Sequence, residues 1–231
     1  MQGDTARNID LESVEGVARR LSDLAYSRIL EILFERRLPA GAFVSQKELV
    51  EMTGVPVGPL RDALRVLEAE GILTIHPRSG IEFVKPGLEL TRATYQFRGI
   101  IETSAVAVYA ETGDETEMAE IERRHRLTAA AVEAEGLTER LRAELDTLEG
   151  LLHNAIIASL RNPLIETSYR RIHNYLRLVR LDRKMTTPLA LRSLREHLAI
   201  IEACRRRSAS DAVAALQTHF ANALQRNMGL Y

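Results

Sequence analysis

Residues 45–84 read SQKELVEMTGVPVGPLRDALRVLEAEGILTIHPRSGIEFV, and this stretch decides the fold of the N-terminal part of the chain. Ser45 is followed three residues later by Glu48, which is the spacing of a capping box at a helix start. Gly54 allows a tight turn after this short helix. Leucines then recur at every third or fourth position of residues 60–71, which predicts a second helix with one apolar face.

A β-hairpin is expected after these two helices. Residues 72–76 and 81–84 read as short strands, and residues 77–80 (PRSG) supply turn-forming residues between them. Upstream, apolar residues recur at helical spacing over residues 17–37, which predicts a further helix before the other two. We expect Pro59 at the first position of the third helix. Three helices and a hairpin in this order predict a winged helix-turn-helix.

The chain after Pro86 is expected to be helical throughout. Gly, Asn-Pro, Thr-Pro and Ser residues separate six runs with helical periodicity. These runs cover about residues 88–111, 114–135, 138–160, 163–181, 188–206 and 210–228. We therefore expect a mainly α protein with two domains. Residues 1–86 would form a winged helix-turn-helix of three helices plus a β-hairpin, and residues 87–231 an all-α antiparallel bundle of about six helices.

Composition places the chain among globular proteins. Of its 231 residues, 45% are hydrophobic and 27% are charged, and 31 Lys and Arg stand against 32 Asp and Glu. The formal net charge of -1 shows no global basic excess, so any contact with DNA must be local. Cys204 is the only cysteine, and there is neither a signal-peptide core nor an apolar run of about 20 residues. These features predict a cytoplasmic protein that does not span a membrane.

The candidate DNA contacts follow from the expected helix-turn-helix. The second helix of such a motif lies in the major groove, where its first residues meet bases and phosphates. A guanidinium one turn into this helix, as at Arg61, suits guanine or phosphate, although a single exposed arginine can equally be a solvated charge. The hairpin tip is where a wing would touch the DNA backbone or the minor groove. The expected DNA-binding residues are Lys47, Val57, Gly58, Arg61, His76 and Arg78.

Residues 25–84 resemble the winged helix-turn-helix of the GntR family. The matching segments are LPAG (38–41), EL (48–49), GV (54–55), PLRDAL (59–64), LEAEGIL (67–73) and PRSG (77–80). The resemblance implies a bacterial transcription regulator. One departure is Pro56-Val57, where the family usually has Ser-Arg, so a side chain that commonly contacts DNA is missing here.

A candidate metal site lies in the helical half. Glu149 and His153 are four residues apart on one helix and therefore share a face. His197 and His219 sit in two other helical runs beside apolar positions that should face inward. Each histidine alone would be an ordinary hydrogen-bonded core residue, but together with the carboxylate they predict a divalent cation, with zinc and nickel favoured. The other histidines, His76, His125 and His173, lack this pattern and are expected to be surface or structural residues.

Residues 88–228 resemble the FCD ligand-binding domain, which defines the FadR-type subfamily of GntR regulators. The subfamily signature has an acid four residues before a histidine, an Asn-Pro nine residues beyond it, and two further histidines. The chain offers Glu149, His153, Asn162-Pro163, His197 and His219 in this order. Members usually carry Asp-x-x-Phe-His, whereas this chain has Glu149 and Leu152. Asp146, two turns before His153, is an outside candidate ligand.

The resemblance also implies a small carboxylate effector that fills open positions on the metal. Arg98, which with Glu102 matches the family's Arg-x-x-x-Glu, is the first candidate to hold the effector, with an intrahelical ion pair to Glu102 as the alternative. Asn174 and Arg177, with Arg180 on the same helix, are further ligand-binding candidates.

These features favour a regulator, acting as a repressor and a homodimer, that binds a palindromic operator and responds to a small carboxylate at its metal. A metal-dependent hydrolase or lyase is an alternative, but the chain offers no evident general base beside the metal and no His-Glu-x-x-His or Gly-x-Ser-x-Gly motif. We therefore do not expect an enzyme. A third possibility is a metal sensor, in which the cation itself is the signal.

Overall fold

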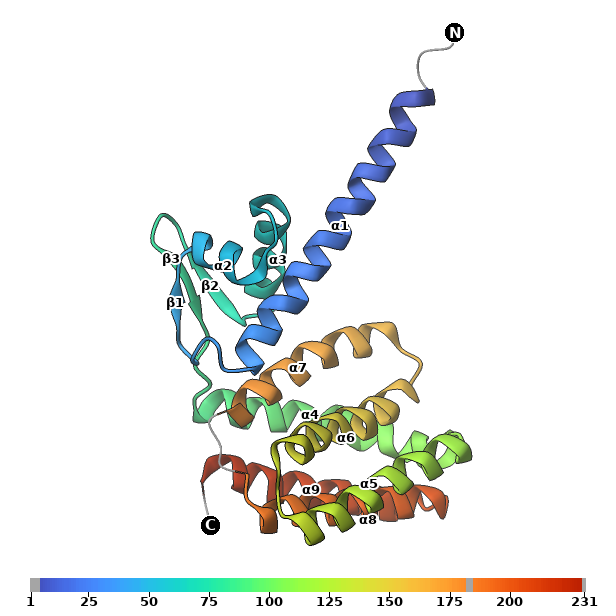
Figure 1. The fold of residues 1–231 in the computed structure, drawn as a ribbon. Helices are drawn as coiled ribbons and strands as arrows, with labels where there is room; N and C mark the ends of the chain where they lie inside the picture. The colour runs from blue at the N-terminus through green and yellow to red at the C-terminus, as the bar shows by residue number, and fades with distance from the viewer. Residues whose placement is uncertain (1–4, 182–184, 230–231) are drawn as a thin grey trace. The chain divides into compact units, whose positions relative to one another are not determined.

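The computed structural model describes residues 5–181 and 185–229 (Figure 1). The chain divides into two compact units, residues 1–86 and residues 87–231. Helices dominate both units, and the strands that the structure describes form one small sheet in the first unit. The predicted fold class, a winged helix-turn-helix followed by an all-helical domain, is confirmed.

The first unit contains three helices and a three-stranded antiparallel sheet. Its elements are α1 (Thr5–Phe34), β1 (Phe43–Val44), α2 (Gln46–Thr53), α3 (Val57–Ala69), β2 (Leu73–His76) and β3 (Gly80–Phe83). The strand order is β1-β3-β2, with Phe43 opposite Glu82 and Ile75 opposite Ile81. The hairpin was expected, but β1 was not, because a strand of two residues is too short to show a period.

Local signals explain where α2 begins and ends. The Glu48 amide donates to the Ser45 hydroxyl at 3.2 Å, and the Ser45 amide donates to the Glu48 carboxylate at 2.7 Å. Both halves of the predicted capping box are therefore present. Gly54 ends the helix in the left-handed conformation, with a φ of 65°, which a residue with a side chain adopts less readily.

The start of α3 differs from the prediction. The helix begins at Val57, so Pro59 is its third residue and not its first. Pro59 is tolerated there because the amides of the first turn have no carbonyl partner inside the helix, so nothing is lost by lacking one. The apolar face of α3, which includes Leu60 and Leu67, is buried, and α1 packs against this helix with Ile29 and Leu33 also buried.

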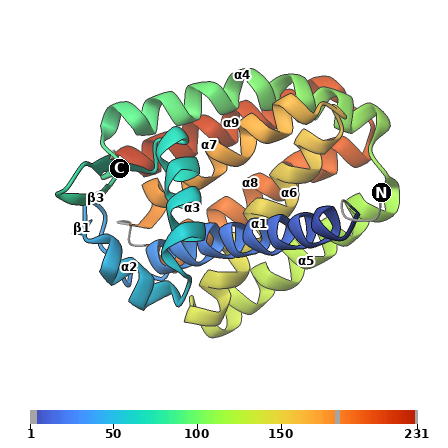
Figure 2. The ribbon, with the colours of Figure 1, turned by 90° about the horizontal axis from the view of Figure 1, so that it is seen from above.

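The second unit is a helical bundle. The residues that the structure describes here form α4 (Leu88–Thr112), α5 (Glu115–Glu135), α6 (Glu139–Ala158), α7 (Pro163–Leu181), α8 (Thr187–Arg205) and α9 (Ala209–Met228). The most extensive packing joins α4 with α9, α9 with α8, and α8 with α5. Figure 2 shows α4 and α9 running alongside each other. Asp114 and Thr138 cap α5 and α6, each accepting a hydrogen bond from a backbone amide of the first turn.

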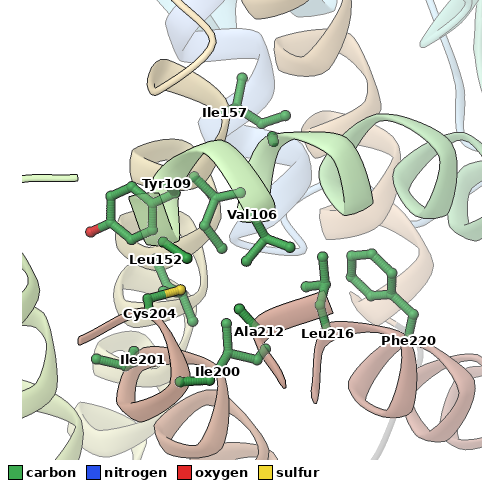
Figure 3. Packing of buried hydrophobic residues seen from close by; sticks show 14 of the residues in the cluster. Val106, Tyr109, Leu152, Ile157, Ile200, Ile201, Cys204, Ala212, Leu216 and Phe220 are labelled. Atoms are coloured by element: carbon green, nitrogen blue, oxygen red, sulfur yellow. The ribbon is translucent and has the colours of Figure 1, made fainter. Parts of the chain in front are cut away.

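The main core of this unit is built by side chains from several helices (Figure 3). Val106 and Tyr109 of α4 meet Leu152 of α6, and α9 contributes Leu216. Cys204 of α8 is a free, fully buried thiol, as expected, and burial raises its pKa to about 12. The thiol therefore behaves here as an apolar core group.

Among the described residues, no helix combines the length and the apolar character that crossing a membrane requires.

Candidate metal centre and DNA surface

Four buried side chains meet inside the helical bundle. Glu149 and His153 come from α6, His197 from α8 and His219 from α9, and each offers one ligand atom that lies within 4.8 Å of the others. We call these four residues the candidate metal site. All four lie against the main core, where bulk water does not reach them. The four residues singled out in the sequence are thus brought together in space.

Within residues 5–181 and 185–229, the Nε2 atoms of the three histidines have no hydrogen-bond partner. All three are buried, although polar atoms in protein interiors are almost always bonded. The Glu149 carboxylate lies 3.3 Å from Nε2 of His197 and 3.5 Å from Nε2 of His153, without hydrogen-bond geometry. Three imidazole nitrogens without hydrogen bonds, beside one carboxylate, match the donor set of a transition-metal site.

The Nδ1 atoms of the same rings are each engaged by a second group. His153 is 2.5 Å from Oε2 of Glu102, and His219 is 3.0 Å from Oε2 of Glu196. A carboxylate oxygen accepts, so each Nδ1 carries the proton, and Nε2 keeps its lone pair. Such partners orient metal-binding imidazoles in known metal sites. Sequence analysis gave Glu102 only as the partner of Arg98 and missed Glu196.

His197 has a different partner. Its Nδ1 lies 3.2 Å from Nε2 of His125, whose own Nδ1 lies 2.8 Å from the carbonyl oxygen of Ile121. His125, expected to be a surface or structural residue, is completely buried in contact with the candidate metal site.

Burial keeps His125, His197 and His219 uncharged. Burial is the main cause that lowers the pKa of His197 to about 3 and that of His219 to about 4, although the neighbouring carboxylates of Glu149 and Glu196 act in the opposite direction. The pKa of His125 falls to about 3 for the same reason, with His197 as the second cause. Neutral imidazole is the form that binds metals.

Glu149 is held as a carboxylate by two arginines. Nη1 of Arg98 lies 3.1 Å and Nη2 of Arg180 lies 2.9 Å from Oε1 of Glu149. Burial alone would raise the pKa of Glu149, but Arg180 and His153 outweigh it, so that the pKa lies well below its usual range.

Arg98 also forms the predicted intrahelical ion pair. Its Nε lies 2.5 Å from Oε1 of Glu102, and this carboxylate, whose pKa burial would raise, is brought to a pKa of about 2 chiefly by Arg98 and then by His153. The side chain of Arg98 is completely buried, and its Nη2 has no hydrogen-bond partner in the part of the chain that the structure describes. Arg98 therefore makes the ion pair and still keeps a donor inside the unit for another group.

The other ligand-binding candidates are placed differently from one another. Asn174 is buried on α7, whereas Arg177 is exposed and interacts with Asp146, which is not part of the four-residue cluster. Arg180, and not Arg177, reaches Glu149. Tyr169 of α7 was missed: its hydroxyl is buried without a hydrogen bond of good geometry, although it interacts with Glu102. His173, expected to be a surface or structural residue, has an Nδ1 that is buried with no hydrogen-bond partner among the described residues.

The predicted DNA contacts lie on exposed parts of the first unit. Lys47 is on α2, Val57, Gly58 and Arg61 are in the first turns of α3, and His76 and Arg78 are at the hairpin tip. We call these six residues the candidate DNA surface. Nε of Arg61 donates to Oε1 of Gln46 at 3.1 Å, which holds the guanidinium beside α2. Nε2 of His76 lies 2.8 Å from Oε2 of Glu82 across the hairpin, so this ring already has an acidic partner.

Comparison with known proteins identifies both units. Residues 21–83 match the bacterial regulatory proteins of the gntR family, and residues 93–222 match the FCD domain. The chain belongs to the GntR family and carries an FCD domain. The predicted family is confirmed, and this GntR protein is a DNA-binding transcription regulator rather than an enzyme.

Several proteins are similar to this GntR regulator over most of its length. YdhC of Bacillus subtilis, described as an uncharacterized HTH-type transcriptional regulator, is 22% identical over 195 residues, which cover 84% of this chain and 85% of YdhC. McbR/YncC of E. coli has a TM-score of 0.76 at 16% identity, with 91% of this chain and 98% of that chain covered. A putative transcriptional regulator GntR from Rhodococcus sp. RHA1 has a TM-score of 0.74 at 20% identity, with 94% and 99% covered. These structures share the fold.

The four residues fit a metal ion. FCD domains commonly bind metals, and this FCD domain presents a buried cluster of three imidazoles and one carboxylate. Three nitrogen donors and one oxygen donor suit zinc, nickel and similar divalent ions better than calcium or magnesium, which prefer oxygen. The unpartnered Nε2 atoms are the observation on which this fit rests.

Proposed function

We propose that this regulator binds a palindromic operator as a homodimer and represses transcription until a small carboxylate, held at a divalent cation in the FCD domain, releases it from DNA. The observation that carries the proposal is the set of three buried Nε2 atoms, each without a partner, that surround Glu149. A cation there would satisfy all three at once and would offset the burial of the carboxylate. Bound to these residues, the metal supplies a positive centre for an anionic ligand.

The charges beside the cluster support a carboxylate effector. Arg98 and Arg180 both contact Glu149, and Arg98 has a buried Nη2 without a partner. Planar guanidinium groups match the two oxygens of a carboxylate. The hydroxyl of Tyr169 adds a buried donor on α7, and Asn174 lies on the same helix. We therefore assign Arg98, Arg180 and Tyr169 to the effector and keep Asn174 as a candidate; the exposed Arg177 is the weakest of the predicted set.

A protein that binds DNA as a symmetric dimer needs an operator with two matching half-sites. Two copies related by a two-fold axis present two copies of α3, and their spacing sets the distance between the operator half-sites. The effector changes operator affinity only as far as it binds one arrangement of the protein better than the other. Such a regulator works where its operator is, in the cytoplasm.

The proposal is tested with the full-length protein and the DNA upstream of its own gene. Gel-shift titrations at low salt should show retardation by the protein, and adding an effector acid should abolish it. The acid is found by thermal-shift screening of lactate, sugar acids, dicarboxylates and aromatic acids, because a ligand of the native state raises the melting temperature. The screen is run on zinc-loaded protein and on chelator-treated protein.

The outcomes separate the parts of the proposal. A shift that appears only with zinc supports a metal-held effector, and an acid that binds equally well after chelation contradicts it. If zinc alone releases the DNA, the protein is a metal sensor and the effector is not needed. Absence of retardation at low salt contradicts operator binding upstream of the gene. For the thermal-shift screen alone, exchange of His76 for alanine serves as a control, because this histidine is outside the candidate metal site.

A further inference from the structure

His125 of α5 is a buried imidazole that binds no cation in the proposed function, yet both of its ring nitrogens are engaged. Its Nδ1 lies 2.8 Å from the carbonyl oxygen of Ile121, and its Nε2 lies 3.2 Å from Nδ1 of His197. The rings of His125 and His197 meet edge to face, with 5.3 Å between their centroids. His125 is the group through which α5 reaches the candidate metal site on α8.

The direction of these hydrogen bonds follows from the chemistry of the groups. A carbonyl oxygen only accepts, so Nδ1 of His125 carries a proton and donates to Ile121. In a neutral ring the other nitrogen, Nε2, is then an acceptor. Nδ1 of His197 must therefore carry a proton to donate to it. The remaining nitrogen of His197, Nε2, is left with a lone pair directed to Glu149, 3.3 Å away.

We propose that His125 is a positioning residue that fixes the proton of His197 on Nδ1 and thereby keeps the Nε2 of His197 free for the cation. Without an acceptor at Nδ1, the neutral His197 ring would gain more by placing its proton on Nε2 and donating it to the Glu149 carboxylate. That tautomer has no lone pair for a cation at this position. The effect on cation binding rests on the proposed metal site. The hydrogen bonds that join Ile121, His125 and His197 are observed without it.

The three imidazoles are oriented by different chemistry. His153 and His219 donate to the carboxylates of Glu102 and Glu196, and these are paired with Arg98 and Arg226 respectively. A third carboxylate at the position of His125 would add a buried negative charge that needs its own cation, at considerable desolvation cost. A neutral imidazole orients His197 without adding that charge. His197 is consequently the ligand whose basicity is raised least by its partner.

Two conservative substitutions separate positioning from packing. In His125→Gln the side-chain amide reaches about as far as Nε2 of the imidazole, so its oxygen can accept from His197. In His125→Asn the amide reaches only about as far as Nδ1, so the contact with His197 is lost. Both variants are polar and uncharged, but asparagine is one methylene smaller, so a role in packing alone predicts a graded loss of stability and no change in the tautomer of His197. Glu120→Ala is a further control, because Glu120 lies on the same helix as His125 but forms an exposed ion pair with Arg123.

The first measurement is the tautomer of His197 in the metal-free, full-length protein, read from ¹⁵N chemical shifts of selectively labelled histidine. His197 should be protonated on Nδ1 in the wild type and in His125→Gln, and largely on Nε2 in His125→Asn. An Nε2-protonated His197 in the wild type, or an Nδ1-protonated His197 in His125→Asn, overturns the proposal. This measurement needs no metal, so its result is independent of whether the protein binds one.

The second measurement is the affinity for cobalt(II), whose visible spectrum reports the ligands around the ion. His125→Asn should bind it about 10–100-fold more weakly than the wild type, which is the usual effect of losing an outer partner. His125→Gln and Glu120→Ala should stay near the wild-type affinity and spectrum. Equal losses in the Asn and Gln variants, with both folded by circular dichroism, contradict a positioning role. A wild-type protein that binds no cobalt contradicts the proposed metal site, while the tautomer result still decides the role of His125.

Discussion

The candidate DNA surface and the candidate metal site are built in opposite ways. On the DNA surface the side chains are exposed on α2, α3 and the hairpin, and the contacts that hold Arg61 and His76 reach no further than the neighbouring element. In the candidate metal site all four side chains are buried, and their partners come from helices far apart in sequence. The first region is thus shaped by local signals and tolerates change, whereas the second depends on many simultaneous contacts.

The sharpest test of this contrast removes ligands from the metal site. Glu149→Ala combined with His153→Ala takes away two of the four donors, and we expect zinc binding to be lost within the range of a calorimetric titration. Retardation of operator DNA by the metal-free protein should remain close to that of the wild type. If the double variant still binds one zinc ion per chain, the cation sits elsewhere. His76→Ala, with its exposed imidazole, should leave zinc binding unchanged.

A second test probes how strongly the buried contacts depend on one another. Glu102→Ala leaves the buried guanidinium of Arg98 with a single carboxylate, Glu149, and removes the acceptor of His153. We expect the free energy of unfolding of the helical unit to fall by about 3–5 kcal/mol, as when a buried ion pair loses one member. Urea denaturation followed by circular dichroism measures it. The matched control is Glu120→Ala on α5, whose ion pair with Arg123 is exposed, and a similar loss there would contradict the contrast.

Sequence reasoning reached the helices, the hairpin and the four residues that cluster in the candidate metal site, because these depend on periodicity, on glycine and proline, and on the one-turn spacing of Glu149 and His153. It placed the start of α3 two residues too late, since Pro59 suits the whole first turn of a helix and not only its first position.

The partners of the donor residues could not be foreseen. Fifty-one residues separate Glu102 from His153, and 72 separate His125 from His197. Periodicity shows which face of a helix turns inward, but not which residue of another helix it will meet. For the same reason the sequence did not distinguish Arg177 from Arg180, two arginines less than one turn apart, although only Arg180 contacts Glu149.

On the DNA surface we expect a smaller effect from a single change. Arg61→Ala should weaken operator binding by about 1–3 kcal/mol and relax the preference at one base pair if the guanidinium reads guanine. If it contacts phosphate instead, binding weakens for all sequences alike and the salt dependence becomes shallower. Fluorescence anisotropy at several salt concentrations distinguishes the two. An unchanged affinity would show that Gln46, and not DNA, is the functional partner of Arg61.

The smallest expected effect concerns the cap of α2. Ser45→Ala removes the hydroxyl that accepts from the Glu48 amide and should lower the stability of the first unit by about 0.5–2 kcal/mol. Because the cap is local, zinc binding by the helical unit should not change. Thermal unfolding of the variant and calorimetry on the same sample test both statements. A loss of zinc affinity in this variant would contradict the local effect expected of the cap.

The early start of α3 has a consequence for what the regulator can discriminate. Since the helix begins at Val57, a branched hydrocarbon that is 42% exposed, followed by a glycine, occupies the place from which a recognition helix approaches base edges. A hydrocarbon meets the 5-methyl group of thymine favourably and displaces no counterions. Selectivity contributed at that base pair should therefore persist in concentrated salt and weaken when uracil replaces thymine.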